Sequence, residues 1–304
     1  MTDYIATLSA AFMLLSVSAA LAQGAGGLDR IVPEGAEVER VATGFTFTEG
    51  PAWDGKGHLY FSDIPENVIK RVDESGNVGV FVEPSEKSNG LMFDAEGYLI
   101  ACRHRGRDVV RISPEGEVEV LAASYKGKRL NSPNDCIIAA DGAIYFTDPH
   151  YGLEGRPREQ EVEGVYRIAP DGSLTRVIDD MTRPNGLFIS PDGKTLYVAD
   201  SQEKKLRAYT LLPDGSATAG RDFAVFETEE RGSPDGMTLD AEGNIYCTDG
   251  GGVWVFDRTG KHLGTIKTPE VPANCTFGGA DRKTLYITAR TSVYRIRLLI
   301  PGLR

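Results

Sequence analysis

The chain has 304 residues, with 33 Lys and Arg against 44 Asp and Glu, a formal net charge of −11 and 41% hydrophobic residues. This composition excludes an intrinsically disordered chain, which would contain fewer apolar residues. The acidic balance argues against a nucleic-acid-binding surface, which needs a basic patch, so no nucleic-acid partner is expected.

The N-terminus is an uncharged, mostly apolar run typical of a secretory signal. The run covers residues 5–19 and is followed by Ala-Leu-Ala at 20–22, a small-x-small pattern that precedes signal cleavage. We interpret residues 1–22 as a signal peptide, although Asp3 stands where Lys or Arg is usual; an uncleaved anchor and a buried helix are the alternatives. Cleavage predicts a periplasmic or secreted protein. No later segment has the roughly 18 apolar residues of a membrane helix, so no membrane association is expected after cleavage.

Six copies of one short pattern divide the rest of the chain. They are HLYFSD at 58–63, YLIACR at 98–103, AIYFTD at 143–148, TLYVAD at 195–200, NIYCTD at 244–249 and TLYITA at 284–289. Most copies follow a turn signal such as DAEG or PDGK, and each precedes a second β-rich run, which indicates antiparallel hairpins. No segment after the signal shows a helical period. The repeat predicts an all-β fold, a six-bladed β-propeller of four-stranded antiparallel blades, with a sandwich or barrel as the second choice.

The two ends of the chain predict how the ring closes. The sequence VYRIRL at 293–298 corresponds to the third strand of a unit, and no fourth strand follows it. Residues 37–43, EVERVAT, resemble the fourth-strand runs of earlier units. We therefore expect the N-terminal strand to complete the last blade, so that residues 30–304 form a single domain.

The four cysteines have no metal-ligand spacing such as CxxC. They are Cys102, Cys136, Cys247 and Cys275. In an oxidising compartment neighbouring blades would allow Cys102 to pair with Cys136 and Cys247 with Cys275, and free buried thiols are an equal alternative.

Each unit also carries an oxygen-bearing side chain ten or eleven residues before the aliphatic residue of its repeat. These side chains belong to Glu49, Asn89, Asn134, Asn185, Asp235 and Asn274. Equivalent positions of a propeller point to one place, so the six groups should converge on the central axis. Carboxylate and amide oxygens suit a hard cation such as Ca²⁺, whereas Zn²⁺ favours His or Cys. The alternative for any one position is a turn, because Asn-Gly and Asp-Gly pairs are turn formers.

Several motifs in order resemble one known family. They are FTEGPAW at 47–53, KRLNSPND at 128–135, FTDPHYG at 146–152, RPNGL at 183–187, SPDGM at 233–237 and NCTF at 274–277. From about Glu37 to the C-terminus the chain resembles the senescence marker protein, gluconolactonase and luciferin-regenerating enzyme family, and is most like bacterial gluconolactonases.

The resemblance implies a metal site. It assigns Glu49, Asn134, Asn185 and Asp235 to one divalent cation, with Ca²⁺ expected and Mg²⁺, Mn²⁺ or Zn²⁺ as alternatives. Asn89 and Asn274 match the phase of the repeat but not the family's ligand set, so we expect them to line the channel.

The loops after the second strand of each unit should form the rim of the pocket. The third, from Thr147 to Gly164, is the longest and is the candidate lid. The candidate catalytic residues are Asp235 and His104, and the candidate substrate-binding residues are Asn131, Asn134, Arg103, Asp148 and Tyr151. A solvated loop charge or a hydrogen bond within the second strand is the alternative for the rim residues.

The expected activity is hydrolysis of a sugar lactone, glucono-1,5-lactone or a related aldonolactone, by attack of water on a metal-polarised carbonyl. Asp235 or His104 would handle the proton. An aryl-lactonase or phosphotriesterase of the same fold is one alternative, and a noncatalytic propeller pinned by calcium is another. The expected partner is a small-molecule lactone, and the expected state is a monomer or a weak homo-oligomer.

Overall fold

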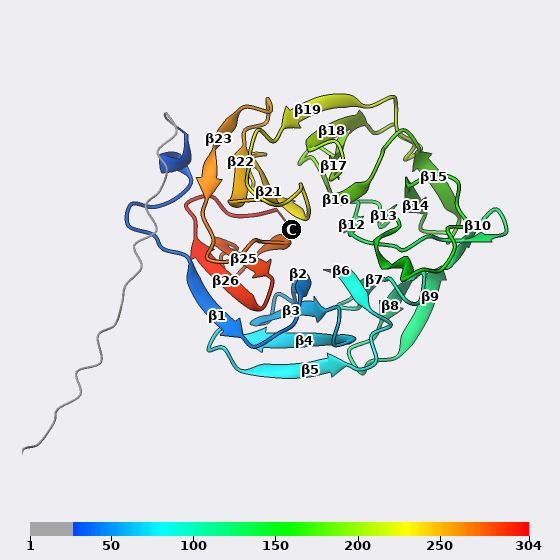
Figure 1. Ribbon diagram of the computed structural model, residues 1–304, viewed down its shortest axis with the longest axis horizontal. Helices are drawn as coiled ribbons and strands as arrows, with labels where there is room; N and C mark the ends of the chain where they lie inside the picture. The colour runs from blue at the N-terminus through cyan, green and yellow to red at the C-terminus, as the bar shows by residue number, and fades with distance from the viewer. Residues whose placement is uncertain (1–26, 304) are drawn as a thin grey trace, which may run out of the picture.

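A computed structural model describes residues 27–303. These residues form six four-stranded antiparallel sheets arranged as blades around a central axis (Figure 1). This arrangement confirms the predicted six-bladed β-propeller. The predicted signal peptide, residues 1–22, lies outside the described residues, and no helix within them is long and apolar enough to span a membrane.

In each blade the strands run from the axis outwards. Blade 1 consists of β2 (Thr48–Trp53), β3 (His58–Asp63), β4 (Val68–Asp73) and β5 (Val78–Val82). Blade 2 consists of β6 (Ser88–Phe93), β7 (Leu99–Arg103), β8 (Asp108–Ile112) and β9 (Val118–Ala122). Blade 3 consists of β12 (Cys136–Ile138), β13 (Ile144–Asp148), β14 (Gly164–Ile168) and β15 (Leu174–Ile178).

The second half of the ring repeats this order. Blade 4 consists of β16 (Pro184–Ile189), β17 (Thr195–Asp200), β18 (Lys205–Thr210) and β19 (Arg221–Val225). Blade 5 consists of β20 (Met237–Leu239), β21 (Ile245–Asp249), β22 (Gly252–Phe256) and β23 (His262–Ile266). Blade 6 consists of β24 (Asn274–Gly278), β25 (Thr284–Ala289), β26 (Ser292–Arg297) and β1 (Glu39–Thr43). A small hairpin, β10 (Ser124–Tyr125) and β11 (Lys128–Arg129), and two 3₁₀ helices, η1 (Leu28–Arg30) and η2 (Tyr151–Leu153), complete the described elements.

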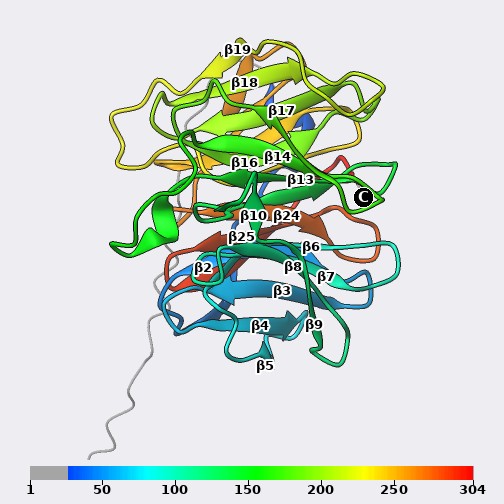
Figure 2. The same cartoon turned by 90° about the vertical axis from the view of Figure 1, so that its right-hand side faces the viewer.

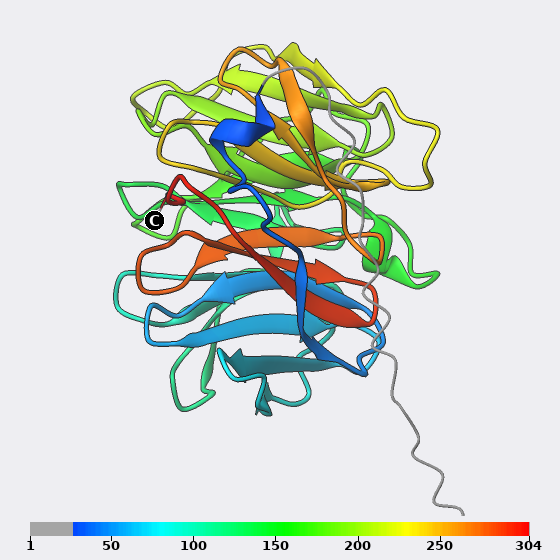
Figure 3. The same ribbon diagram turned by 90° about the vertical axis from the view of Figure 1, so that its left-hand side faces the viewer.

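The two ends of the chain close the ring, as the sequence predicted. Strand β1 pairs antiparallel with β26, with Glu39 opposite Arg295 and Thr43 opposite Ser292. In Figure 3 the blue N-terminal strand lies along the red C-terminal one. The Nε of Arg295 donates to Oε2 of Glu39 at 3.0 Å. The last sheet edge is therefore paired by a strand from the other end of the chain.

The turns between first and second strands explain why the repeat is so visible in the sequence. The tetrapeptide DAEG occurs at 94–97 and at 240–243. In both copies the Asp Oδ1 accepts two backbone N–H groups, from Glu96 and Tyr98 or from Glu242 and Asn244, at 2.8–3.0 Å. The glycine that follows has a φ of 86° or 82°, which only glycine adopts readily.

The apolar core lies between the blades. Tyr246 of blade 5 packs edge-to-face on Phe277 of blade 6, with ring centroids 5.1 Å apart, inside a cluster that takes side chains from both blades. The four cysteines are buried in such clusters as free thiols, so the structure shows neither of the two disulfides that the sequence would allow. Each of the six clusters of buried residues within residues 27–303 joins two neighbouring blades, so each blade depends on its neighbours for its core.

Candidate active site

Six polar side chains meet at the axis, where the innermost strand of each blade begins. Glu49, Asn89, Asn185 and Asn274 lie within β2, β6, β16 and β24, and Asn134 and Asp235 lie just before β12 and β20. Asp235 keeps some solvent contact, and the other five are buried. The predicted convergence is therefore present in the fold.

A chain of amide groups links blades 2, 3 and 4. Nδ2 of Asn89 donates to Oδ1 of Asn134 at 2.7 Å, and Nδ2 of Asn134 donates to Oδ1 of Asn185 at 2.6 Å. The chain ends at Ser201, whose Oγ accepts from Nδ2 of Asn185 at 3.1 Å. Each amide oxygen has two lone pairs. The oxygen of Asn185, with this one donor, therefore keeps acceptor capacity while its orientation is fixed, whereas the oxygen of Asn134 also lies 3.3 Å from Nε2 of His104.

Three carboxyl groups lie beside this amide chain. Burial, followed by the charge of Asp135, raises the pKa of Asp235 to about 8. Burial raises the pKa of Asp135 to about 7, and burial together with the charges of Asp235 and Asp135 raises the pKa of Glu49 well above its ordinary value. Within residues 27–303 none of the three forms an ion pair. Like charges gathered in this way favour a cation between them or protons upon them.

Sequence reasoning did not assign a role to Asp135. Its Oδ2 accepts from Nδ2 of Asn274 at 3.2 Å, and its Oδ1 accepts from the backbone N–H of Cys136 at 2.9 Å. The sequence did mark this position, because in the third unit Asp follows Asn134 where most other units have Gly.

The glycines that follow the axial residues serve close packing rather than turns. Gly186 and Gly236 lie beside the axis, and their backbone N–H groups donate to the carbonyl oxygens of Asp235 and Ala273. A Cβ on Gly186 would lie 2.3 Å from the oxygen of Asp235, and one on Gly236 would lie 1.9 Å from Cγ of Asn274. A side chain there would force adjacent blades apart. The turn alternative therefore does not describe these positions.

His104 lies on the loop after β7 and reaches the amide chain. Its Nε2 is 3.3 Å from Oδ1 of Asn134 and 3.4 Å from Nδ2 of Asn89. Burial lowers the pKa of His104 to about 4. The imidazole is therefore neutral at pH 7 and is placed to donate to the oxygen of Asn134.

Aspartates at the end of the second strand support the axial residues in three blades. Each accepts backbone N–H groups from the loop that leads into its innermost strand: Asp63 from Thr46 and Phe47, Asp148 from Asn131 and Ser132, and Asp200 from Thr182 and Arg183. In every case the second of these N–H groups lies two residues before Glu49, Asn134 or Asn185. We call these three residues the loop aspartates.

The structure places two predicted substrate-binding residues below the surface of the site. Asp148 is fully buried, and its two carboxylate oxygens accept the N–H groups of Asn131 and Ser132 at 2.7 and 2.8 Å. The amide of Asn131 donates to the carbonyl oxygens of Asp148 and Val162 and accepts the N–H of Gln160. Both side chains hold the long loop of blade 3, and their contact with a substrate stays a prediction.

The two remaining rim residues differ in position. Arg103 makes a two-bond pair with Asp108, with both N–O distances 2.7 Å, on the rim of blade 2. Tyr151, in η2, has a partly exposed ring and a hydroxyl that lies 3.5 Å from Nδ2 of Asn185. Burial raises the pKa of Tyr151 to about 12. Tyr151, and not Arg103, therefore adjoins the axial residues.

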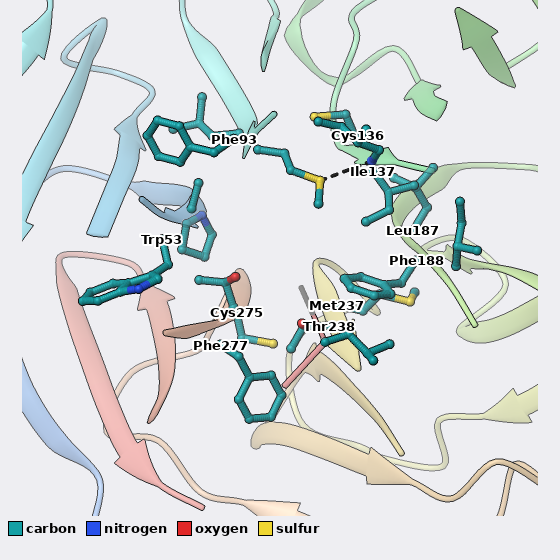
Figure 4. Close-up of a pocket in the computed structure, with 18 of the residues that line it drawn as sticks. Trp53, Phe93, Cys136, Ile137, Leu187, Phe188, Met237, Thr238, Cys275 and Phe277 are labelled. Atoms are coloured by element: carbon teal, nitrogen blue, oxygen red, sulfur yellow. Dashed lines mark hydrogen bonds between the residues drawn. The ribbon is translucent and has the colours of Figure 1, made fainter. Parts of the chain in front are cut away.

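One opening of the axis lies on the face opposite these loops. A cavity of about 990 Å³ is lined by the ends of the innermost strands, with Trp53, Phe93, Leu187, Phe188 and Phe277 among its walls (Figure 4). The C-terminal tail lies at this mouth, and Figure 2 shows it at the opposite end of the molecule from the long green loop of blade 3. A second cavity of about 420 Å³ lies beside that loop, against His150, Tyr151 and Arg156.

The donor set fits a hard cation. Within residues 27–303 no three His, Cys, Asp or Glu side chains form a metal site by themselves, so a cation at the axis would need amide oxygens as well. Glu49, Asp235, Asn134 and Asn185 supply two carboxylates and two amides, a combination suited to Ca²⁺ or Mg²⁺. Glu49 and Asp235, which form no ion pair within residues 27–303, give such an ion a charge to neutralise.

Solved structures and curated proteins resemble this chain over most of its length. The gluconolactonase of Zymomonas mobilis is 35% identical over 298 residues, which cover 89% of this chain and 83% of that protein. The structure of a gluconolactonase from Xanthomonas campestris superposes with a TM-score of 0.83 at 37% identity, covering 89% of this chain and 92% of that one.

A second solved structure shares the fold at lower identity. Regucalcin from Agrobacterium tumefaciens, described as a calcium-binding protein, superposes with a TM-score of 0.75 at 22% identity, covering 88% of this chain and 96% of that one. The sequence profile of the SMP-30/Gluconolactonase/LRE-like region matches residues 47–291. With the ring, the axial residues and this match together, the chain belongs to the SMP-30/gluconolactonase/LRE-like family.

Proposed function

We propose that this protein is a divalent-cation-dependent lactonase that opens the cyclic ester of a sugar lactone, with glucono-1,5-lactone as the expected substrate. The observation that carries the proposal is the position of Glu49, Asn134, Asn185 and Asp235, from four blades, at the start of the innermost strands around the axis. The family and the two gluconolactonases reported above support the reaction class. The calcium-binding relative supports Ca²⁺ as the ion.

The chain's own residues would hold the cation and orient the reacting groups. Glu49 and Asp235 supply the charge, and Asn134 and Asn185 supply neutral oxygens whose directions the amide chain fixes. When bound, a divalent cation polarises the lactone carbonyl and stabilises the negative charge that develops on its oxygen. The loop aspartates keep three of these four residues in place, because they bind the backbone two and three residues before each.

Asp235 is the better candidate to accept the proton of the attacking water. Its pKa of about 8 in the cation-free site shows how strongly this environment resists a further negative charge. A divalent cation held by Asp235 would lower that value and weaken Asp235 as a base, so this role relies on a carbonyl polarised enough to need little base assistance. His104, with a pKa of about 4, is a weaker base and is better placed to fix the amide of Asn134.

The polar mouth favours a hydroxyl-rich substrate over an aryl ester. The loop face carries Tyr151, His150 and the half-buried Arg183, whereas the aromatic lining belongs to the cavity on the opposite face. An aryl-lactonase or phosphotriesterase would use aromatic walls around the scissile bond. The distribution of side chains therefore ranks a sugar lactone first.

The test is hydrolysis of glucono-1,5-lactone by purified protein, measured as acid release above the spontaneous rate. Turnover should disappear after chelation and return with Ca²⁺, Mg²⁺, Mn²⁺ or Zn²⁺, and the ion that restores most activity identifies the cofactor. A folded, cation-loaded protein that shows no turnover would contradict the sugar-lactone proposal. Aryl lactones and phosphotriesters assayed in parallel would then test the alternative substrates.

A further inference from the structure

The long loop of blade 3, residues 149–163, reaches across to blade 4. It carries Tyr151, whose hydroxyl lies 3.5 Å from Nδ2 of Asn185. The guanidinium carbon of Arg183, the residue just before β16, lies 5.5 Å from the centre of the Tyr151 ring. This geometry is a cation–π contact. It holds the tip of a blade 3 loop against the first strand of blade 4.

Arg183 is oriented in turn by two residues of the same loop. Its Nη2 lies 3.4 Å from Nε2 of His150, and Nδ1 of His150 lies 2.5 Å from Oε1 of the buried Glu163. Arg158 also contacts Oε1 of Glu163, at 3.1 Å. Because a carboxylate only accepts hydrogen bonds, Nδ1 of His150 carries the proton, and Nε2 keeps a lone pair that accepts from Arg183.

The backbone of Arg183 is held separately. Its N–H donates to Oδ1 of Asp200, one of the loop aspartates, at 3.3 Å. The main chain of Arg183 is therefore fixed by blade 4 and its side chain by the blade 3 loop. A side chain held at both ends has little freedom to lose when it positions another group.

We propose that Arg183 is a positioning residue that holds Tyr151 over the mouth of the site. The hydrogen-bonded pair Glu163 and His150 orients the side chain of Arg183. The proposal rests on the proposed function, because it assigns Tyr151 to the closure of the site over a bound lactone. The Tyr151 ring would offer a flat apolar surface to the C–H face of a sugar ring. Since Arg183 contacts Asp200, His150 and Tyr151 and makes no hydrogen bond to the six residues at the axis, its loss should weaken substrate binding and leave the chemical step nearly unchanged.

The experiment compares four single variants with wild type. Arg183→Gln removes the positive charge of the guanidinium group. His150→Leu removes the imidazole that links Glu163 to Arg183, whereas His150→Gln keeps one hydrogen-bond donor and one acceptor at that position. Arg105→Gln is the matched control, because Arg105 is an exposed arginine on the neighbouring rim loop. Arg183→Gln should raise KM for glucono-1,5-lactone about 5- to 10-fold and change kcat less than about 2-fold. His150→Leu should also raise KM, and His150→Gln should have a KM close to that of wild type.

Two further measurements distinguish the loss of a positioning contact from a general loss of structure. The double variant Arg183→Gln/His150→Leu should raise KM no more than Arg183→Gln alone, because both residues act through one contact. Backbone hydrogen exchange in residues 149–155 should speed up in Arg183→Gln and His150→Leu and stay unchanged in Arg105→Gln. Additive effects, or an unchanged KM in Arg183→Gln, would overturn the proposal. If wild type hydrolyses no lactone, the proposed function fails by itself, and the exchange rates alone decide whether Arg183 holds the loop.

Discussion

Asp235 and His104 approach the axis from different environments, and their protonation differs accordingly. Burial, followed by the charge of Asp135, raises the pKa of Asp235 to about 8. His104 lies among amides, and burial lowers its pKa to about 4. At neutral pH one group resists losing a proton and the other resists gaining one. This contrast is the basis for proposing Asp235, and not His104, as the base.

Replacing Asp235 by Asn tests whether the site is catalytic or only structural. The substitution keeps the size of the side chain and removes a carboxylate, so kcat should fall about 10²- to 10⁴-fold. Without cation at pH 8, Asp235→Asn should unfold at the same temperature as wild type or higher, because it removes a buried like charge. A structural ion would instead give a large loss of stability in the cation-loaded protein with little loss of turnover per folded molecule.

Replacing His104 by Gln tests its role on Asn134. Gln offers an N–H to the same oxygen but has no titrating group, so kcat should stay within about 3-fold of wild type, while His104→Leu should lower it further. The measurement is the pH profile of kcat/KM for each variant. A loss of 10²-fold or more in His104→Gln, with the disappearance of one limb of the profile, would show that His104 moves the proton.

The residues of the site were predictable to different degrees. Glu49, Asn134, Asn185 and Asp235 recur at one phase of the repeat, and phase is what brings equivalent positions of a propeller together. The supporting contacts of Asp148 and Asn131 were not predictable, because a loop aspartate that binds backbone N–H groups has the same composition as one that binds a sugar hydroxyl. Only the directions of the side chains distinguish the two cases.

At the scale of the single element, the loop aspartates connect the second strand of a blade to its first. Each lies at the end of the second strand and binds the loop that leads to an axial residue. The last residue of the repeat HLYFSD, AIYFTD or TLYVAD thus has a structural reason to be acidic. Blade 5 ends its second strand with Asp249, whose Oδ1 accepts from Gly250 and whose Oδ2 has no partner among the described residues.

The variant Asp148→Asn tests this support. An amide in place of the carboxylate would turn an N–H towards the backbone N–H of Asn131 or Ser132 and leave a buried donor unpaired, at a cost of about 1–3 kcal/mol. The midpoint of thermal unfolding should fall by about 3–10 °C. Asp171→Asn, in an exposed turn, is the control and should shift the midpoint little. Equal midpoints for the two variants would contradict the supporting role of Asp148.

At the scale of the whole molecule, the architecture was the most predictable feature. Six copies of one pattern imply six similar units, and the count of strands at the two ends implied that β1 would complete blade 6. The face on which the larger cavity opens was not predictable. It depends on how the bulky side chains at the ends of the innermost strands, such as Trp53 and Phe188, stand away from the axis.

Removing β1 tests the closure of the ring. A variant that begins at Gly44 would leave the edge of β26 unpaired and expose side chains such as Val293, which packs in the cluster between blades 6 and 1. We expect the midpoint of thermal unfolding to fall by about 10 °C or more, with self-association at high protein concentration. A variant that begins at Gly27 keeps β1 and should match the full-length protein. Equal stability of the two truncated forms would show that the closure contributes nothing.

The dependence of stability on pH should reveal the cation. The pKa values of Asp135 and Asp235 are about 7 and 8 in the folded protein, against an ordinary value of 3.8, so the cation-free folded state holds more protons than the unfolded state between about pH 4 and pH 8. The free energy of unfolding of that form should therefore fall as pH rises through this window.

Added Ca²⁺ should reverse the trend. The ion competes with protons for the same oxygens, so the rise in unfolding temperature that it causes should be small at pH 5 and large at pH 8. Calorimetry at both values, with chelator or with Ca²⁺, makes the comparison. A stabilisation by Ca²⁺ that is equal at pH 5 and pH 8 would place the ion away from these carboxylates.

The pairing of β1 with β26 also determines when the newly synthesised chain can close the ring. Glu39 and Arg295 are 256 positions apart, so at roughly 5–20 residues per second the first strand waits on the order of 10–50 s at the ribosome before its partner is made. During that time the ring of blades cannot close, and β1, the outer strand of blade 6, has no strand to pair with. The six axial residues reach their final spacing only after the last strand has left the ribosome. A truncated product from interrupted synthesis would therefore be an open, inactive arc, which proteases and chaperones can recognise by its unpaired edges.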